Sequence, residues 1–142
     1  MSGYLKVPLS PYLELIGVKV DHVKYPRAGL TLSWAENLVN PMGTLHGGII
    51  ATLIDAAPGC VLLNEEDVTG IATVEVKVNY FKAVTAGSVT ALGEILYRKS
   101  STAFGQTRVY QGKDLIAIGS VTYKLAGKHK NNKKIKTVVI KN

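Results

Sequence analysis

The chain has 142 residues, of which 46% are hydrophobic and 19% charged, and this is the composition of a single globular domain. It contains no apolar run of 18 residues, and its N-terminus lacks the basic start and apolar stretch of a signal peptide, so we expect neither membrane insertion nor secretion. Six lysines between residues 127 and 142 supply most of the net charge of +7, because the rest of the chain has eleven basic residues against ten acidic ones. We therefore divide the chain into a domain over residues 1–126 and a lysine-rich tail over 127–142. The single cysteine, Cys60, excludes an internal disulfide and fits a reducing cytoplasm, where we expect the protein.

The first predicted elements are a short helix and a hairpin. Residues 10–16 (SPYLELI) carry a serine cap followed by proline, which are the signals of a helix start. Residues 18–25 begin with alternating apolar and polar side chains, as a half-buried strand does. A second strand is predicted over residues 30–34, with the turn formed by Pro26 and the Ala28-Gly29 pair.

The longest predicted helix spans residues 46–63 and is apolar nearly all round. Only Thr52 and Asp55 interrupt its apolar run from Ile49 to Leu63. A helix that is hydrophobic on every face is usually buried, and aspartate is rarely buried without a partner, so Asp55 is the main candidate for chemistry. Pro58 removes one helical hydrogen bond and is expected to bend the helix beside Asp55.

The chain beyond residue 70 is predicted to form strands. Their spans are 71–81, 88–97, 102–110 and 115–125. The turns between them are short, which makes neighbouring strands antiparallel. Period-two alternation in the first of these strands places its two sets of side chains on opposite faces, one set being Val74, Val76 and Val78 and the other Thr73, Glu75, Lys77 and Asn79.

This order of elements predicts an α+β fold. Five to six antiparallel strands with one long apolar helix must bury that helix, so we expect a curved sheet wrapped around it. Gly93 and Gly105 lie inside strands, where glycine indicates a bulge or a tight bend.

The strings NPMGTLHGGIIATLIDAA (40–57) and TVEVKVNYF (73–81) carry a resemblance to a known family. Together with the element order, they resemble the hotdog-fold acyl-CoA thioesterase superfamily, in the branch that holds the phenylacetate-pathway and THEM-type thioesterases. The resemblance covers roughly residues 11–125. It implies the hotdog fold and the hydrolysis of an acyl-CoA thioester to a free acid and coenzyme A.

The resemblance also implies roles for five residues. The backbone N–H of Gly47 would polarise the thioester carbonyl, with His46 and Asn40 organising the loop beside it. Asp55 would act on the acyl carbon as a nucleophile, or on water as a general base, and the hydroxyl of Thr73 would help to hold the carboxylate or the water. A helix N-terminus favours the negative charge that develops on the carbonyl oxygen, so the physical chemistry agrees with the implied role of Gly47.

Helix geometry predicts that this site needs two subunits. Asp55 is eight residues from Gly47, which is about 12 Å along a helix axis at roughly 1.5 Å per residue. One thioester carbon cannot contact both positions in one chain, so we expect an obligate homodimer whose sites lie across the interface. The family resemblance extends this expectation to a homotetramer, a dimer of dimers.

Coenzyme A enters only as part of the substrate, and neither a cofactor nor a metal site is expected. Gly48 would let the substrate approach the helix start closely. The phosphates of coenzyme A would meet basic residues, for which the candidates are Lys82 and the turn formed by Arg98, Lys99 and Ser100. The lysine-rich tail is a further candidate for such a contact.

Three alternatives remain open from the sequence. A non-catalytic acyl-CoA-binding hotdog module would keep the fold without the chemistry, but it would not need Asp55. Hotdog dehydratases use a different acid–base arrangement, against which the HGG-then-Asp pattern argues. Binding of nucleic acid is not expected, because six lysines in one terminus are weak evidence when the body is nearly neutral.

Overall fold

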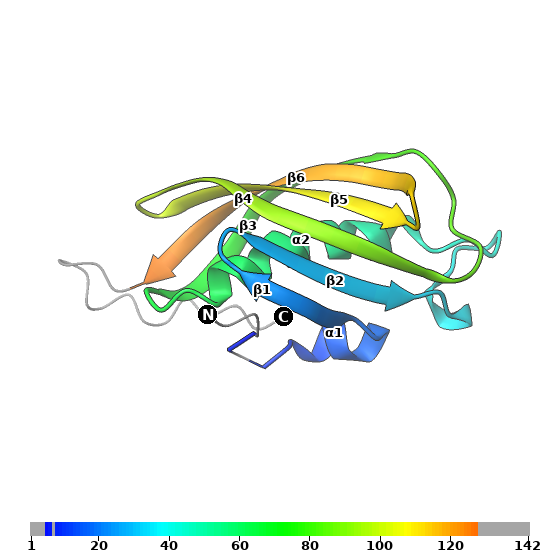
Figure 1. Ribbon diagram of the computed structural model, residues 1–142, viewed down its shortest axis with the longest axis horizontal. Coiled ribbons are helices and arrows are strands. Elements are labelled where there is room, and N and C mark those ends of the chain that lie inside the picture. Colours follow the sequence, from blue (N-terminus) through cyan, green and yellow to red (C-terminus); the bar gives the residue numbers. More distant parts are fainter. Residues whose placement is uncertain (1–4, 7, 128–142) are drawn as a thin grey trace.

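The computed structural model describes residues 5, 6 and 8–127 (Figure 1). Of the predicted tail only Gly127 is described, so the division at residue 126 stays a prediction. The elements in chain order are α1 (Pro11–Ile16), β1 (Lys19–Lys24), β2 (Arg27–Ser33), the 3-10 helix η1 (Glu36–Leu38), α2 (Gly47–Leu63), β3 (Val68–Tyr80), β4 (Ser88–Lys99), β5 (Thr102–Gln111) and β6 (Asp114–Gly127).

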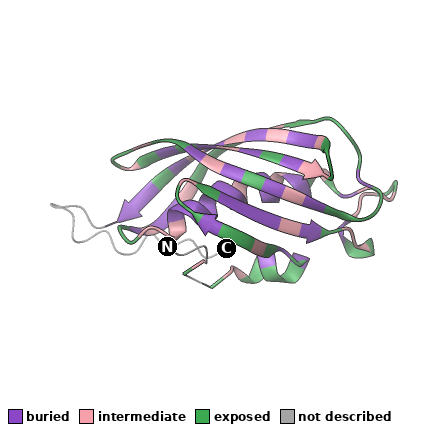
Figure 2. Ribbon diagram, in the orientation of Figure 1, coloured by how far each residue is buried: buried purple, intermediate pink, exposed green. Residues whose placement is uncertain are grey.

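The six strands form one antiparallel sheet in the order β1-β2-β4-β5-β6-β3. Figure 1 shows this sheet curved around α2, which confirms the predicted hotdog fold. Purple, buried segments alternate with exposed ones along the strands in Figure 2, because only one face of the sheet meets the helix. The strand that follows α2, β3, pairs with β6 and therefore forms an edge of the sheet.

The first hairpin has its turn at Pro26, as predicted, but the turn is shorter than the prediction. The turn lies at Tyr25-Pro26, whose peptide bond is cis, and β2 already begins at Arg27. The prediction that Ala28-Gly29 forms the turn is therefore wrong. Gly29 instead lies inside β2, where the imidazole of its partner His22 occupies the space that a Cβ atom would need.

The glycines inside the strands allow the helix to approach the sheet. A Cβ atom at Gly93 would lie 2.7 Å from the Cβ of Ala57, and one at Gly105 would lie 2.7 Å from the Cβ of Pro58. The register irregularity in β4 falls between Ile95 and Tyr97, which pair with Gly105 and Phe104 of β5, and not at Gly93. Both glycines therefore allow close packing against α2, and the predicted bulge lies opposite Gly105 but not at Gly93.

Candidate active site

Asp55 projects from the middle of α2 and is half-buried. Its Oδ1 atom accepts a hydrogen bond of 2.8 Å from the hydroxyl of Thr73 on β3. Burial raises the pKa of Asp55 because it disfavours the charged form, and the hydrogen bond from Thr73 opposes this rise. The carboxylate is thus oriented by one donor and made more basic by its surroundings.

Thr73 lies on the face of β3 that meets α2, and β3 becomes irregular just after it. A register shift between Thr73 and Glu75 breaks the strict alternation of the strand. Thr73 and Tyr80 are seven residues apart, so in a regular strand their side chains would point to opposite faces of the sheet. Both instead bond α2, which means that Thr73 lies on the same face as Tyr80 and as Val76, four residues before Tyr80. The prediction that Thr73 lies on the opposite face from all three valines is therefore wrong.

Two hydroxyl groups from the sheet support the backbone of α2 next to this carboxylate. Tyr123 donates from its hydroxyl to the carbonyl oxygen of Asp55 at 2.5 Å. Thr107, which is fully buried, donates to the carbonyl oxygen of Ile54 at 2.8 Å. Pro58 has no N–H to give to Ile54, so Thr107 replaces the missing donor, and α2 continues from Gly47 to Leu63 without a break.

We expect Thr107→Val to lower the free energy of unfolding by about 1–3 kcal/mol, since it leaves the Ile54 carbonyl buried without a donor. The loss of unfolding free energy caused by Thr107→Val should be smaller in a Pro58→Ala background, where residue 58 regains an N–H that can donate to the carbonyl of Ile54. Urea unfolding of the four proteins of this double-mutant cycle measures the coupling. Strictly additive changes would contradict the replacement of one donor by the other.

The second half of the site is the start of α2. His46 is the helix cap, and its Nδ1 atom accepts from the N–H of Gly48 at 2.8 Å. Tyr80 donates from its hydroxyl to the carbonyl oxygen of Gly47 at 2.7 Å. The N–H of Gly47 has no acceptor among the residues that the structure describes. The cap therefore occupies one amide and leaves the neighbouring one available to a ligand.

Asn40 fixes the loop that leads into this helix start. Its Oδ1 atom accepts from the N–H groups of Met42 and Thr44, at 2.9 and 3.1 Å, while its Nδ2 atom donates to the hydroxyl of Thr44 at 2.7 Å. The N–H of Leu45 then donates to the carbonyl oxygen of Val84 at 2.8 Å. Asn40 thus shapes the loop, and the hydrogen bond from Leu45 to Val84 ties the loop to the segment after β3.

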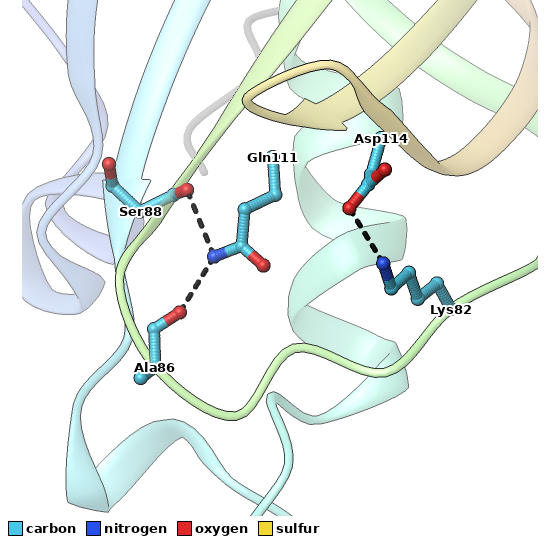
Figure 3. A network of polar contacts seen from close by, with 5 residues as sticks. All are labelled: Lys82, Ala86, Ser88, Gln111 and Asp114. Carbon is cyan, nitrogen blue, oxygen red and sulfur yellow. Dashed lines mark hydrogen bonds and ion pairs between the residues drawn. The ribbon is translucent and has the colours of Figure 1, made fainter.

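That segment, residues 81–87, is held against the turn between β5 and β6. Figure 3 shows Gln111 donating to the carbonyl oxygen of Ala86, at 2.7 Å, and Lys82 paired with Asp114, at 2.6 Å between charged atoms. These contacts fix both ends of the segment. The segment therefore lies beside the start of α2, where Leu45 bonds the carbonyl oxygen of Val84.

The two halves of the site open into different cavities. A cavity of about 330 Å³ is lined by Gly47 with Asn40, Tyr80 and Lys82 among its neighbours. A cavity of about 850 Å³ contains Asp55 and Thr73. No residue lines both cavities. Within one chain, therefore, the free amide and the carboxylate do not face a common space.

The structure also separates the predicted contacts to coenzyme A. Arg98 pairs with Asp67 at 2.6 Å and with Glu65 at 3.7 Å, just beyond the C-terminal end of α2. Lys82 lies near the opposite end of that helix, in the cavity of Gly47. Lys99 and Ser100 are exposed at the turn between β4 and β5, where Ser100 has a φ of 52°. Gly48 is exposed beside Gly47.

Sequence reasoning missed three hydroxyl groups of this site, those of Tyr80, Thr107 and Tyr123. Tyr80 had a usable signal, because it follows Val76 and Val78 at period two and so shares their face. Thr107 and Tyr123 meet α2 only through the pairing of distant strands, which no local pattern shows. No group of three His, Cys, Asp or Glu side chains within residues 5, 6 and 8–127 could hold a metal ion. In the same described ranges, no helix is long and apolar enough to cross a membrane.

Comparison with known proteins places this geometry in a family. Residues 42–118 match the family model of the thioesterase superfamily. A Saccharolobus solfataricus protein, provisionally assigned as an esterase, is 34% identical over 89 residues, which are 63% of this chain and 63% of that protein. The match thus spans less than two thirds of that relative. A 1,4-dihydroxy-2-naphthoyl-CoA hydrolase of Listeria monocytogenes is 28% identical over 82% of this chain and 97% of its own length.

Solved structures share the fold. A conserved protein from Pseudomonas aeruginosa superposes with a TM-score of 0.78 and 28% identity, covering 82% of this chain and 94% of that one. The phenylacetic acid degradation protein PaaI from Thermus thermophilus, solved as a point mutant, gives a TM-score of 0.74. It is 23% identical over 80% of this chain and 97% of its own, and this second likeness concerns the fold alone.

Proposed function

Because the chain belongs to the thioesterase superfamily, we propose that it is an acyl-CoA thioesterase that hydrolyses its substrate in sites shared between two subunits. Asp55 acts on the acyl carbon, either directly or through a water molecule. The N–H of Gly47 from the partner subunit polarises the carbonyl. The reaction adds water across the C–S bond and releases a free acid and the thiol of coenzyme A.

The observation that carries this proposal is the division of the site into two cavities. Gly47 and Asp55 are eight residues apart on one continuous helix, about 12 Å at roughly 1.5 Å per residue. Each opens into a cavity that excludes the other. A two-fold symmetric dimer would solve this geometry, because it can place the helix start of one subunit against the carboxylate of the other, twice.

The edge strand β3 offers the surface for such a dimer. Its outer edge has no strand beside it in the sheet that the described residues form. Val74 is 66% exposed and Val76 37% exposed, although both are apolar. Proteins usually cover an exposed apolar edge strand, and pairing with a second copy would do so. The further expectation of a dimer of dimers is supported by apolar side chains on the outer face of β4 and β5, namely Leu92, Leu96 and Phe104.

The chemistry follows from the charges that change during hydrolysis. The carbonyl oxygen becomes negative as the acyl carbon is attacked, and an unpaired amide at a helix start stabilises that charge. A carboxylate with a raised pKa is a stronger base than an exposed aspartate. The thioester is already an activated acyl group, so these two groups can suffice. Lys82 lies near enough to the Gly47 cavity to serve as a contact for the phosphates of coenzyme A.

The test is the release of free coenzyme A from a panel of acyl-CoA thioesters, followed with a thiol reagent. We expect turnover with at least one member. Binding of acyl-CoA without any thiol release would contradict the enzyme and leave the non-catalytic binding module in its place.

A further inference from the structure

The cavity of Asp55 has three walls that come from distant parts of the chain. One wall is a single face of α2, because its residues recur at helical spacing: Thr52, Asp55, Ala56, Gly59, Cys60 and Leu63. The second wall is one face of β3, formed by Thr69, Ile71 and Thr73 at period two. Residues 5 and 8–13, which precede and begin α1, form the third wall.

The cavity changes in character along its length. Near Asp55 it carries hydroxyl groups, including a contact of 3.0 Å between the side chains of Tyr12 and Thr52. Further along it is lined by apolar side chains, which are those of Leu5, Leu9, Ala56, Cys60, Leu63 and Ile71. Burial, and then the charge of Asp55, raise the pKa of the Cys60 thiol to about 12, so this thiol is a neutral part of the wall.

The size and position of this cavity indicate which part of the substrate it binds. Leu63 lies eight residues beyond Asp55, about 12 Å along the helix at roughly 1.5 Å per residue. The volume of about 850 Å³ falls in the range of roughly 300–1,000 Å³ that is typical of pockets that enclose whole small molecules. The attacking carboxylate marks where the acyl carbon must sit, so the apolar remainder of the cavity receives what that carbon carries.

We propose, on the basis of the proposed function, that this cavity binds the acyl group and makes the enzyme selective for large apolar acyl-CoA thioesters over acetyl-CoA. Leu63 together with residues 5 and 8–13 sets the limit on acyl size. An acetyl group is too small to contact the apolar walls. Each further methylene group that enters the cavity is removed from water, which favours binding. Each should raise kcat/KM about threefold to fourfold, up to the length at which the chain reaches Leu63.

The test is a series of straight-chain substrates, from acetyl-CoA through butyryl-CoA and octanoyl-CoA to palmitoyl-CoA. Wild-type kcat/KM should rise with length and reach its maximum beyond butyryl-CoA. Leu63→Trp fills the far end, so it should lower kcat/KM for the longest accepted substrate at least tenfold while changing that for butyryl-CoA far less. Leu9→Trp narrows the cavity from the N-terminal segment and should act in the same direction. The matched control is Leu15→Trp, because Leu15 is 79% exposed on α1 and does not line the cavity.

The outcomes separate this inference from the proposed function. Acetyl-CoA as the best substrate, or length profiles for both cavity variants that match that of Leu15→Trp, would overturn the acyl assignment while leaving the thioesterase intact. If no substrate releases thiol, the proposed function fails. Binding of 1-decanol, measured by titration calorimetry, then still tests the cavity: Leu63→Trp should weaken this binding at least tenfold against Leu15→Trp, and equal binding would overturn the inference.

Discussion

Asp55→Asn should lower kcat/KM for an acyl-CoA thioester by about 10²–10⁴-fold, which is the usual contribution of a positioned general base. The amide has nearly the shape of the carboxylate and can still accept the hydrogen bond that Thr73 donates at 2.8 Å. It cannot take a proton from water or form an acyl intermediate. Thiol release under subsaturating substrate measures the loss, and circular dichroism checks that the variant is folded. Activity within a few-fold of wild type would exclude Asp55 from the chemistry.

The pH dependence of kcat/KM tests the catalytic role of Asp55 a second time. Burial raises the pKa of Asp55, and the carboxyl must be deprotonated to act, so kcat/KM should rise with pH through this raised pKa and then level off. Thr73→Val removes the donor that stabilises the charged form. This variant should therefore move the acidic limb to higher pH. If the acidic limb moved to lower pH or stayed in place, the hydrogen bond from Thr73 would not be what lowers the pKa of Asp55.

Gly47→Pro should lower kcat by about 10²–10³-fold, the usual loss when one backbone donor to a developing oxyanion is removed. Gly47 is the first residue of α2, and proline is favoured at that position because its missing N–H has no helical partner there. His46 before it has φ −59° and ψ 138°, an extended conformation that precedes proline readily. The substitution therefore removes little except the amide hydrogen.

Gly47→Ala is the matched control for that loss. A Cβ atom at this position would lie 3.3 Å from the hydroxyl oxygen of Tyr80, and both variants introduce it. Alanine keeps the N–H, so it should retain most of the activity that proline removes. Equal losses in the two variants would mean that crowding against Tyr80, and not the missing donor, causes the effect.

The sequence predicted those parts of the fold that local patterns control. The run from Ile49 to Leu63 is apolar on every face, and α2 is accordingly buried under the sheet. The strand boundaries were close, because turn residues separate clear alternating segments. Pro26 was placed correctly in the first turn, but Ala28 and Gly29 lie in β2, where His22 of β1 packs over Gly29. Such a contact joins two strands and leaves no signal in either one alone.

The candidate site was only partly predictable for the same reason. Asp55 stood out because a carboxylate is unusual in an apolar helix, and Gly47 because the HGG string at the predicted helix start resembles the family motif. The register shift after Thr73, which brings Tyr80 to the same face of the sheet, depends on the pairing of β3 with β6. The donation from Thr107 that offsets Pro58 depends on strand β5, more than 40 residues away from that proline. Residues joined by the sheet have to be found from the structure.

The division of each active site between two subunits is tested most directly by mixing inactive subunits. Asp55→Asn and Gly47→Pro chains, each with its own affinity tag, are coexpressed and the heterodimers isolated on both tags in turn. Each heterodimer would have one site with both wild-type groups, so activity should return to roughly a quarter to a half of wild type, far above either parent. Folded heterodimers that stay as inactive as their parents would contradict the shared site.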